Sequence, residues 1–265
     1  MLTSLALGLA VGVVLALTGA GGGILAVPLL VFGAGIGVAQ AGPIGLMAVG
    51  MAAALGAALG LRAGVVRYRA AMLVATAGML FSPAGLWIAR RVENRWLGVL
   101  FALTLLYVAF ATFRKARAGV DGPAGDGPVP VCVRGGGSGR FVWTRPCARA
   151  LALSGTVAGL LSGLLGVGGG FVMVPALRRY TDLTMQSAVA TSLAVIALIS
   201  AAGVAASAAS GTLAWGIALP FSAGALAGML GGRALSQRLP GSHLQIGFAA
   251  VSAVVALGMI AKELT

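Results

Sequence analysis

The sequence predicts an all-α integral membrane protein made of two homologous four-segment halves, and three observations support this fold class. The chain has 265 residues, of which 59% are hydrophobic and only 9% are charged, whereas soluble domains carry roughly 25% charged residues. Its apolar runs are long enough to cross a bilayer, for which about 20 residues suffice. The second half repeats the pattern of the first at an offset of 146–147 residues.

Four apolar runs precede a polar stretch and four follow it. The stretch 114–148 is basic and rich in glycine and proline, a composition typical of a loop. It divides the chain into an N-terminal membrane repeat (1–113), a linker (114–148) and a C-terminal membrane repeat (149–265). The first run lacks a basic flank, so we interpret it as mature protein and not as a signal peptide. The runs cover residues 2–32, 39–61, 70–89, 96–113, 150–177, 185–210, 213–235 and 244–261.

The repeat is clearest in two glycine-rich stretches. "GAGGGILAVP" at 19–28 matches "GVGGGFVMVP" at 166–175, and "LGVLFA" at 97–102 matches "LQIGFA" at 244–249. Duplicated halves are a common architecture of secondary transporters.

The basic residues indicate how the halves are oriented. If the two glycine-broken runs (2–32 and 150–177) enter the membrane and return, three segments per half cross it, and the two sides carry 14 and 4 Lys and Arg. If all eight runs cross, the sides carry 11 and 7. The positive-inside rule favours the first arrangement. We therefore expect inverted halves in the bacterial inner membrane, with both termini outside and the linker cytoplasmic; a long kinked helix is the alternative to each re-entrant segment.

The repeated glycines and prolines predict a helix break in each half. Irregular backbone within a membrane is tolerated only where protein or water covers it. A break leaves N–H groups at a helix start, where anions bind. The alternative is that the glycines only allow close helix packing. The candidate substrate-binding residues in the breaks are Gly21, Gly22, Gly23, Pro28, Gly168, Gly169, Gly170 and Pro175.

Uncharged polar side chains at the start of the runs 39–61 and 185–210 extend this candidate site. Hydroxyl and amide groups can donate hydrogen bonds to an anion without carrying charge. They can equally bond one helix to another. The candidates are Gln40, Gln186, Ser187, Thr191 and Ser192.

Several functions are disfavoured by what the apolar runs lack. All five acidic residues lie in loops or at the C-terminus, and the single histidine, His243, lies at a segment edge. We therefore expect no proton relay, no enzyme activity, no cofactor and no metal site. The net charge of +13 lies in the gaps between apolar runs, so we expect no nucleic-acid partner. Cys132 and Cys147 are expected as free thiols, although a disulfide could form in an oxidising compartment.

The paired glycine–proline stretches, the "QSAVATSLAV" stretch at 186–195 and the two-half layout resemble the TauE/SafE sulfite exporter family over nearly the whole chain. The resemblance implies a small sulfur-containing oxyanion, sulfite or an organosulfonate, as substrate. It points to Gly168–Gly170, Pro175, Thr191 and Ser192, and to Gly21–Gly23 with Pro28. The first half departs from this pattern, since it reads "AGPIGL" at 41–46 where a Thr-Ser pair would be expected.

The sequence thus predicts a secondary transporter that exports a small sulfur oxyanion, driven outward by the membrane potential. Its expected partners are the anion and the lipid bilayer, and a homodimer is compatible with the sequence. The alternatives are an uptake permease for a small organic anion, an anion channel and a membrane scaffold.

Overall fold

The computed structural model describes residues 2–18, 22–117, 131–132, 143–236 and 241–264. Within these residues the chain is helical, and the only β pairing is an isolated bridge between Cys132 and Thr181. The expected all-α fold class is therefore confirmed. The elements are α1 (Leu2–Thr18), η1 (Gly22–Leu25), α2 (Ala26–Gly33), α3 (Val38–Arg62), α4 (Tyr68–Arg91), α5 (Asn94–Arg117), α6 (Arg145–Leu165), α7 (Gly170–Tyr180), α8 (Met185–Ala209), α9 (Trp215–Ser236) and α10 (Gly241–Leu264).

Six of the described helices are long and apolar enough to cross a membrane: α3, α4, α5, α6, α8 and α9. With the composition of the chain, they make it a multi-pass membrane protein. Six membrane crossings were also expected from the sequence, but the six helices are not all the expected ones. Helix α6 is one of the six although we expected it in a re-entrant segment, whereas the described apolar part of α10 is only Ala249–Met259.

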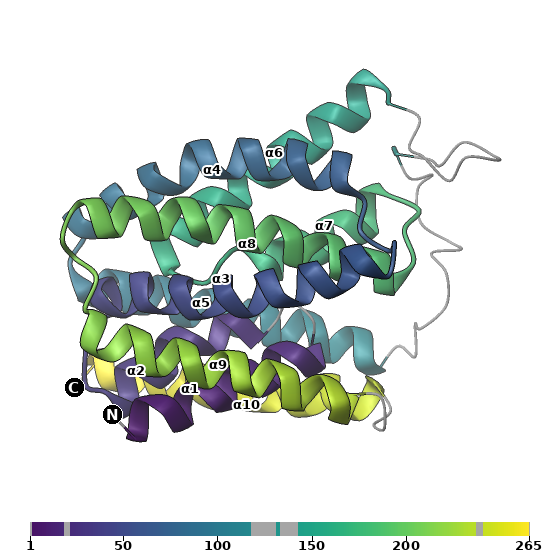
Figure 1. The fold of residues 1–265 in the computed structure, drawn as a ribbon. Helices are drawn as coiled ribbons and strands as arrows, with labels where there is room; N and C mark the ends of the chain where they lie inside the picture. The colour runs from purple at the N-terminus through teal and green to yellow at the C-terminus, as the bar shows by residue number, and fades with distance from the viewer. Residues whose placement is uncertain (1, 19–21, 118–130, 133–142, 237–240, 265) are drawn as a thin grey trace.

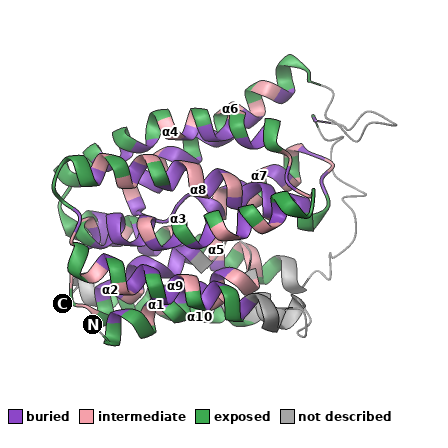
Figure 2. Ribbon diagram, viewed as in Figure 1, coloured by how far each residue is buried: buried purple, intermediate pink, exposed green. Residues whose placement is uncertain are grey.

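Helices α3 and α8 form the centre of the bundle (Figure 2). They are the most buried of the six long helices and pack against each other. Both consist almost entirely of small and apolar residues, and a helix that is apolar on all sides suits a buried position. The outer helices α4 and α5 instead expose large apolar side chains such as Leu80, Trp87 and Tyr107. Such an apolar outer surface is compatible with lipid rather than water.

The packing of the helices follows the internal duplication. At an offset of about 147 residues, α1, α3, α4 and α5 correspond to α6, α8, α9 and α10. Accordingly, the contact of α1 with α9 is matched by that of α6 with α4, and the contact of α3 with α9 by that of α8 with α4. The remaining large interfaces, α3 with α8 and α5 with α10, each join corresponding helices. Both described chain ends lie at one end of the bundle in Figure 1.

Glycines at four-residue spacing bring two helix pairs into backbone contact. Gly155, Gly159 and Gly163 of α6 face the backbone of α4, so closely that an added Cβ would overlap carbonyl groups there. Gly8 and Gly12 of α1 face the backbone of α9 in the same way. Small residues at such spacing are the usual means of close helix packing in membranes. These residues thus show the close packing that the sequence also allowed for the glycines of the two breaks.

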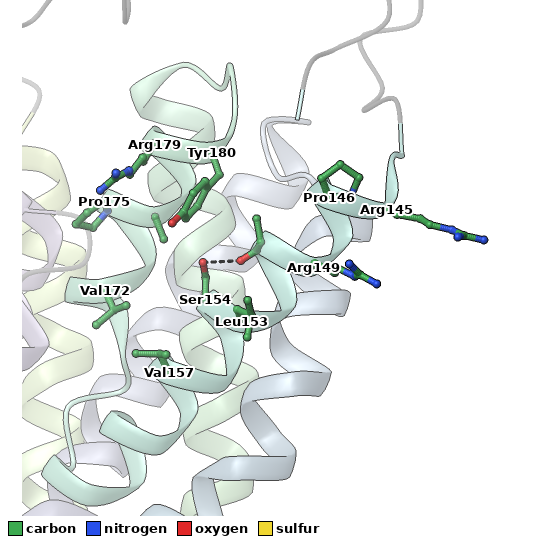
Figure 3. A pocket seen from close by; sticks show the side chains of 12 residues that line it. Arg145, Pro146, Arg149, Leu153, Ser154, Val157, Val172, Pro175, Arg179 and Tyr180 are labelled. Atoms are coloured by element: carbon green, nitrogen blue, oxygen red, sulfur yellow. Dashed lines mark hydrogen bonds between the residues drawn. The ribbon is translucent and has the colours of Figure 1, made fainter. Parts of the chain in front are cut away.

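Helices α6 and α7 form a hairpin and not a long kinked helix. Figure 3 shows α7 running back alongside α6, so that Tyr180 at the end of α7 lies near the start of α6. A disulfide joins Cys147, in the first turn of α6, to Cys132. The backbone N–H of Cys132 donates to the Tyr180 carbonyl at 2.9 Å, which ties the end of α7 to the same place. The expectation of two free thiols is wrong, because the fold brings the two Cα atoms within 5.1 Å.

Candidate functional site

The break in the second half is a buried four-residue turn between α6 and α7. Gly166 ends α6 with φ 70°, and Gly169 precedes α7 with φ 68°. Residues with a side chain rarely adopt this left-handed conformation. The glycines therefore allow the chain to reverse direction within the core, where the Gly166 N–H still donates to the Ser162 carbonyl at 2.9 Å. The start of α7, with the N–H groups of its first turn, follows directly.

The corresponding break in the first half has a different local structure. Residues Gly22–Leu25 form a short 3-10 helix that leads directly into α2. Gly23 and Pro28 are both buried. Gly21 lies outside the described residues. The two matching sequence stretches thus give two breaks of unequal geometry.

The two breaks meet in the centre of the molecule. A Cβ added to Gly23 would lie 2.9 Å from the Val167 carbonyl oxygen and 3.0 Å from Cγ1 of Val49. A Cβ on Gly168 would lie 3.3 Å from the same Val49 atom. On the other side, a Cβ on Gly45 would lie 2.9 Å from the Gly166 carbonyl oxygen. Helix α3 therefore lies against both breaks through small or β-branched residues.

Helix α8 adds a hydroxyl group to this meeting point. The Ser200 Oγ would lie 3.1 Å from a Cβ on Gly168, and the Ser200 Cβ packs beside Gly50 of α3. Ser200 is completely buried, and its hydroxyl has no hydrogen-bond partner among the described residues. A buried hydroxyl without a partner costs roughly 1–3 kcal/mol. Such a group beside a turn of irregular backbone indicates a place where a ligand can bind.

Two more hydroxyls of the same kind lie around this region. Ser82 of α4 and Ser162 of α6 are completely buried and also lack a hydrogen-bond partner within the described structure. The Ser82 Oγ would lie 3.2 Å from a Cβ on Gly203, three residues beyond Ser200 on α8. Ser162 is one turn before the break at Gly166. Three helices thus contribute unpartnered hydroxyls around the second-half break.

Gln186 and Ser187 lie away from the breaks, whereas Gln40 lies two residues before Gly42, where an added Cβ would be 3.5 Å from the Gly166 Cα. Gln40 and Gln186 are exposed in the first turns of α3 and α8. The Ser187 N–H donates to the capping hydroxyl of Thr184 at 3.4 Å. The 13 residues from Ser187 to Ser200 correspond to about 20 Å of helix, so this end of α8 is not at the breaks.

Thr191 and Ser192 are completely buried but already bonded. The Thr191 hydroxyl accepts from the Arg67 backbone N–H at 3.1 Å, which fastens the α3–α4 loop to α8. The Ser192 hydroxyl donates to the Val189 carbonyl at 2.8 Å. The structure therefore gives both hydroxyls local partners, and it does not bring them to Gly168.

The glycines and the proline of the second-half stretch separate in the structure. Gly168, Gly169 and Gly170 are buried at the break. Pro175 is exposed in the middle of α7 and lines a cavity on the outer side of the α6–α7 hairpin. Pro175 is thus positioned away from the meeting point of the breaks.

Sequence reasoning missed the three unpartnered serines. Ser200 stands in the apolar run "VIALISAAG" at 195–203, where a serine is ordinarily a packing residue. Its spacing from Ser192 is eight residues, or about two turns, so helical periodicity could have extended the polar face to it. Ser162 could have been found from its position four residues before Gly166, whereas Ser82 carries no such signal, because only the tertiary packing brings α4 near the break.

Comparison with known proteins identifies the family. A model of the family described as "Sulfite exporter TauE/SafE" matches residues 4–259. The chain belongs to the TauE/SafE family. Because this match includes both breaks and every long helix, the meeting point described above lies within the TauE/SafE part of the chain.

Curated relatives agree with this TauE/SafE assignment and are described only as transporters. The "Probable membrane transporter protein YunE" of Bacillus subtilis (strain 168) is 27% identical over 88% of this chain and 87% of its own. A "Probable membrane transporter protein" of Xylella fastidiosa (strain 9a5c) is 29% identical over 88% of this chain and 84% of its own. One from strain Temecula1 is 30% identical with the same coverage. No solved structure gives a significant match. Together, family and relatives make this protein a membrane transporter.

Proposed function

We propose that this TauE/SafE protein is a secondary transporter that exports a small sulfur-containing oxyanion, sulfite or an organosulfonate, and that the substrate binds where the two helix breaks meet. The observation that carries the proposal is the buried, unpartnered Ser200 hydroxyl beside Gly168. The family description, which names sulfite export, supports the substrate class.

The chemistry of this meeting point suits an anion that is released as readily as it binds. The start of α7 offers N–H groups and the positive end of the helix dipole. Ser200, Ser162 and Ser82 offer hydroxyls that can donate hydrogen bonds. None of these groups carries a full charge, so they can stabilise an oxyanion without holding it in a fixed ion pair.

The contact between the breaks supports an alternating-access mechanism. Gly23 and Val167 are so close that an added Cβ would overlap the carbonyl oxygen, so the breaks close off the centre in this arrangement. Transport would require the two breaks to separate toward one side and then the other. We propose inverted repeats for this motion, supported by the matched helix contacts and by the charge distribution of 14 and 4.

The proposed orientation gives the transported anion a driving force. The basic side, including the 114–148 linker, would be cytoplasmic, and the protein would lie in the bacterial inner membrane. A membrane potential contributes about 2.3 kcal/mol per charge per 100 mV. An anion in a cell with a negative interior is thereby driven outward without a coupled proton.

Flux from proteoliposomes tests the proposal. Vesicles loaded with sulfite and clamped inside-negative with potassium and valinomycin should release it in a saturable way, faster than vesicles at zero potential. Acetate and lactate should be released slowly. Release of carboxylates but not of sulfur oxyanions would favour the organic-anion permease, and strictly proton-coupled electroneutral release would refute the potential-driven mechanism. Flux that does not saturate would indicate a channel.

A further inference from the structure

We propose that the groove between α6 and α7 binds an anionic phospholipid, with its phosphate at the arginines of the linker end and an acyl chain between the two helices. The groove is a cavity of about 710 Å³ on the outer side of the hairpin. This volume lies within the range of about 300–1,000 Å³ that is usual for ligand pockets. The site is distinct from the meeting point of the breaks.

Basic residues from both helices frame one end of the groove. Arg145 and Arg149 come from the first turns of α6, and Arg179 comes from the last turn of α7 (Figure 3). Their side chains are exposed, so long flexible stems can carry the guanidinium groups to a headgroup. Arginine is well suited to phosphate because its planar group donates two hydrogen bonds at once. The described lining contains no carboxylate that would compete.

Apolar residues line the other end. Leu153 and Val157 of α6 face Val172 of α7 across the groove (Figure 3). Leu153 is 67% exposed and Val157 is 47% exposed, on a helix that is apolar enough to cross a membrane. These side chains therefore lie at the depth of the lipid tails, and a lipid tail can enter the groove between them.

A groove with one basic end and one apolar end suits a lipid better than the transported substrate. A small hydrophilic anion gains nothing from an apolar floor beneath its charge, whereas a phospholipid has both an anionic headgroup and an apolar chain. Basic pockets between membrane helices are a known setting for anionic headgroups.

The mouth of the groove is held in place by covalent and hydrogen bonds. The disulfide joins Cys147, between Arg145 and Arg149, to Cys132. The Cys132 N–H donates to the carbonyl of Tyr180, the neighbour of Arg179. In the disulfide-bonded protein, the first turn of α6 and the end of α7 are thus held near one another before any lipid arrives, which reduces the entropy cost of binding.

Lipid titration of the purified, detergent-solubilised full chain tests the proposal. Native mass spectrometry would count bound dioctanoyl phosphatidylglycerol against dioctanoyl phosphatidylcholine, with inorganic phosphate as a separate addition. The wild type should bind phosphatidylglycerol in preference to phosphatidylcholine. In the R149Q/R179Q variant, which removes one arginine from each helix, affinity for phosphatidylglycerol should fall roughly 30-fold. V157W, which fills the apolar part of the groove, should also weaken binding.

A matched variant controls for the loss of charge. R91Q/R95Q removes two exposed arginines from the end of α4 and the start of α5, which do not line the groove, and it should bind like the wild type. Equal loss of binding in both double variants, or equal binding of the two lipids, would overturn the proposal. Displacement of phosphatidylglycerol by millimolar inorganic phosphate, with no effect of V157W, would identify a site for free anions and would equally overturn it. Because these readouts do not involve transport, they are independent of the proposed function.

Discussion

Replacing Ser200 by alanine should make the protein more stable and a poorer transporter. The Ser200 hydroxyl is fully buried and has no hydrogen-bond partner among the described residues, so the folded state bears its desolvation cost. Alanine removes that oxygen and leaves the Cβ, which packs beside Gly50, in place. If the hydroxyl forms a hydrogen bond only with the bound anion, the substitution should raise the stability of the protein and lower its transport rate.

The structure gives a magnitude for each effect. Removing a buried unpartnered hydroxyl should raise the free energy of unfolding by about 1–3 kcal/mol. For a chain of this size each kcal/mol shifts the melting temperature by roughly 2–4 °C, so S200A should melt roughly 2–12 °C higher. A hydrogen bond to a charged group is worth about 1.5–3 kcal/mol. Its loss should reduce the kcat/KM for sulfite efflux roughly 10- to 100-fold.

Two serine controls separate a substrate contact from a structural one. Ser207, also buried on α8, donates to the Gly203 carbonyl at 2.8 Å, so S207A should lose up to about 1 kcal/mol and transport normally. Ser222 of α9 is buried and unpartnered within the described structure but is not near Gly168, so S222A should gain stability without losing transport. The assay measures melting temperature and sulfite efflux from proteoliposomes on the same preparations. Wild-type efflux in S200A, or an equal loss of efflux in all three variants, would show that the Ser200 hydroxyl does not bind the transported anion.

The remaining predictions concern the breaks, the helix packing and the linker. G169A should lower the melting temperature more than G211A. Both glycines have positive φ, but only at Gly169 would an added Cβ lie 2.6 Å from a backbone oxygen, that of Ala158. An equal fall in melting temperature for the two variants would show that the backbone near Ala158 moves to accommodate the Cβ. G159V should separate α4 from α6 and reduce the yield of folded protein by fluorescence size-exclusion chromatography, whereas G231V, which points into open space, should not. If the linker is cytoplasmic, Cys132 and Cys147 should be alkylatable thiols in acid-quenched cells, because the cytoplasm is reducing, and they should form the disulfide after purification. A disulfide already present in cells would place the linker outside and reverse the proposed orientation.

The fold class could be predicted because it depends on composition and periodicity. A chain with so few charges must cover its surface with lipid, and the repeat at about 147 residues marks corresponding helices. The glycine stretches correctly marked the breaks, since few other residues tolerate the conformation found at Gly166 and Gly169. The charge distribution favoured a run that enters the membrane and returns over a kinked helix, and the α6–α7 hairpin (Figure 3) agrees with this expectation for the second half.

The polar groups around the breaks could not be predicted from sequence alone. Thr191 and Ser192 stand out in the sequence, yet the structure gives both local hydrogen bonds. Whether a hydroxyl such as that of Ser200 is free depends on which backbone lies beside it, and this is decided by tertiary packing. The disulfide was missed for a similar reason. Cys132 pairs with Thr181, at the end of α7, in an isolated β-bridge, and this tertiary contact places it beside Cys147.

Ligand-dependent thermal stability is the most direct test of an anion site at the helix breaks. Purified wild-type protein and S200A would be melted in detergent with sulfite, thiosulfate, sulfate, sulfoacetate, acetate, lactate or chloride. A ligand that binds only the folded protein stabilises it by about 2.7 kcal/mol at 100 times its Kd, or roughly 5–10 °C here. An anion site at the breaks predicts such a shift with sulfite or a sulfonate, and a much smaller shift in S200A. No shift with any anion, or the same shift in both proteins, would contradict it.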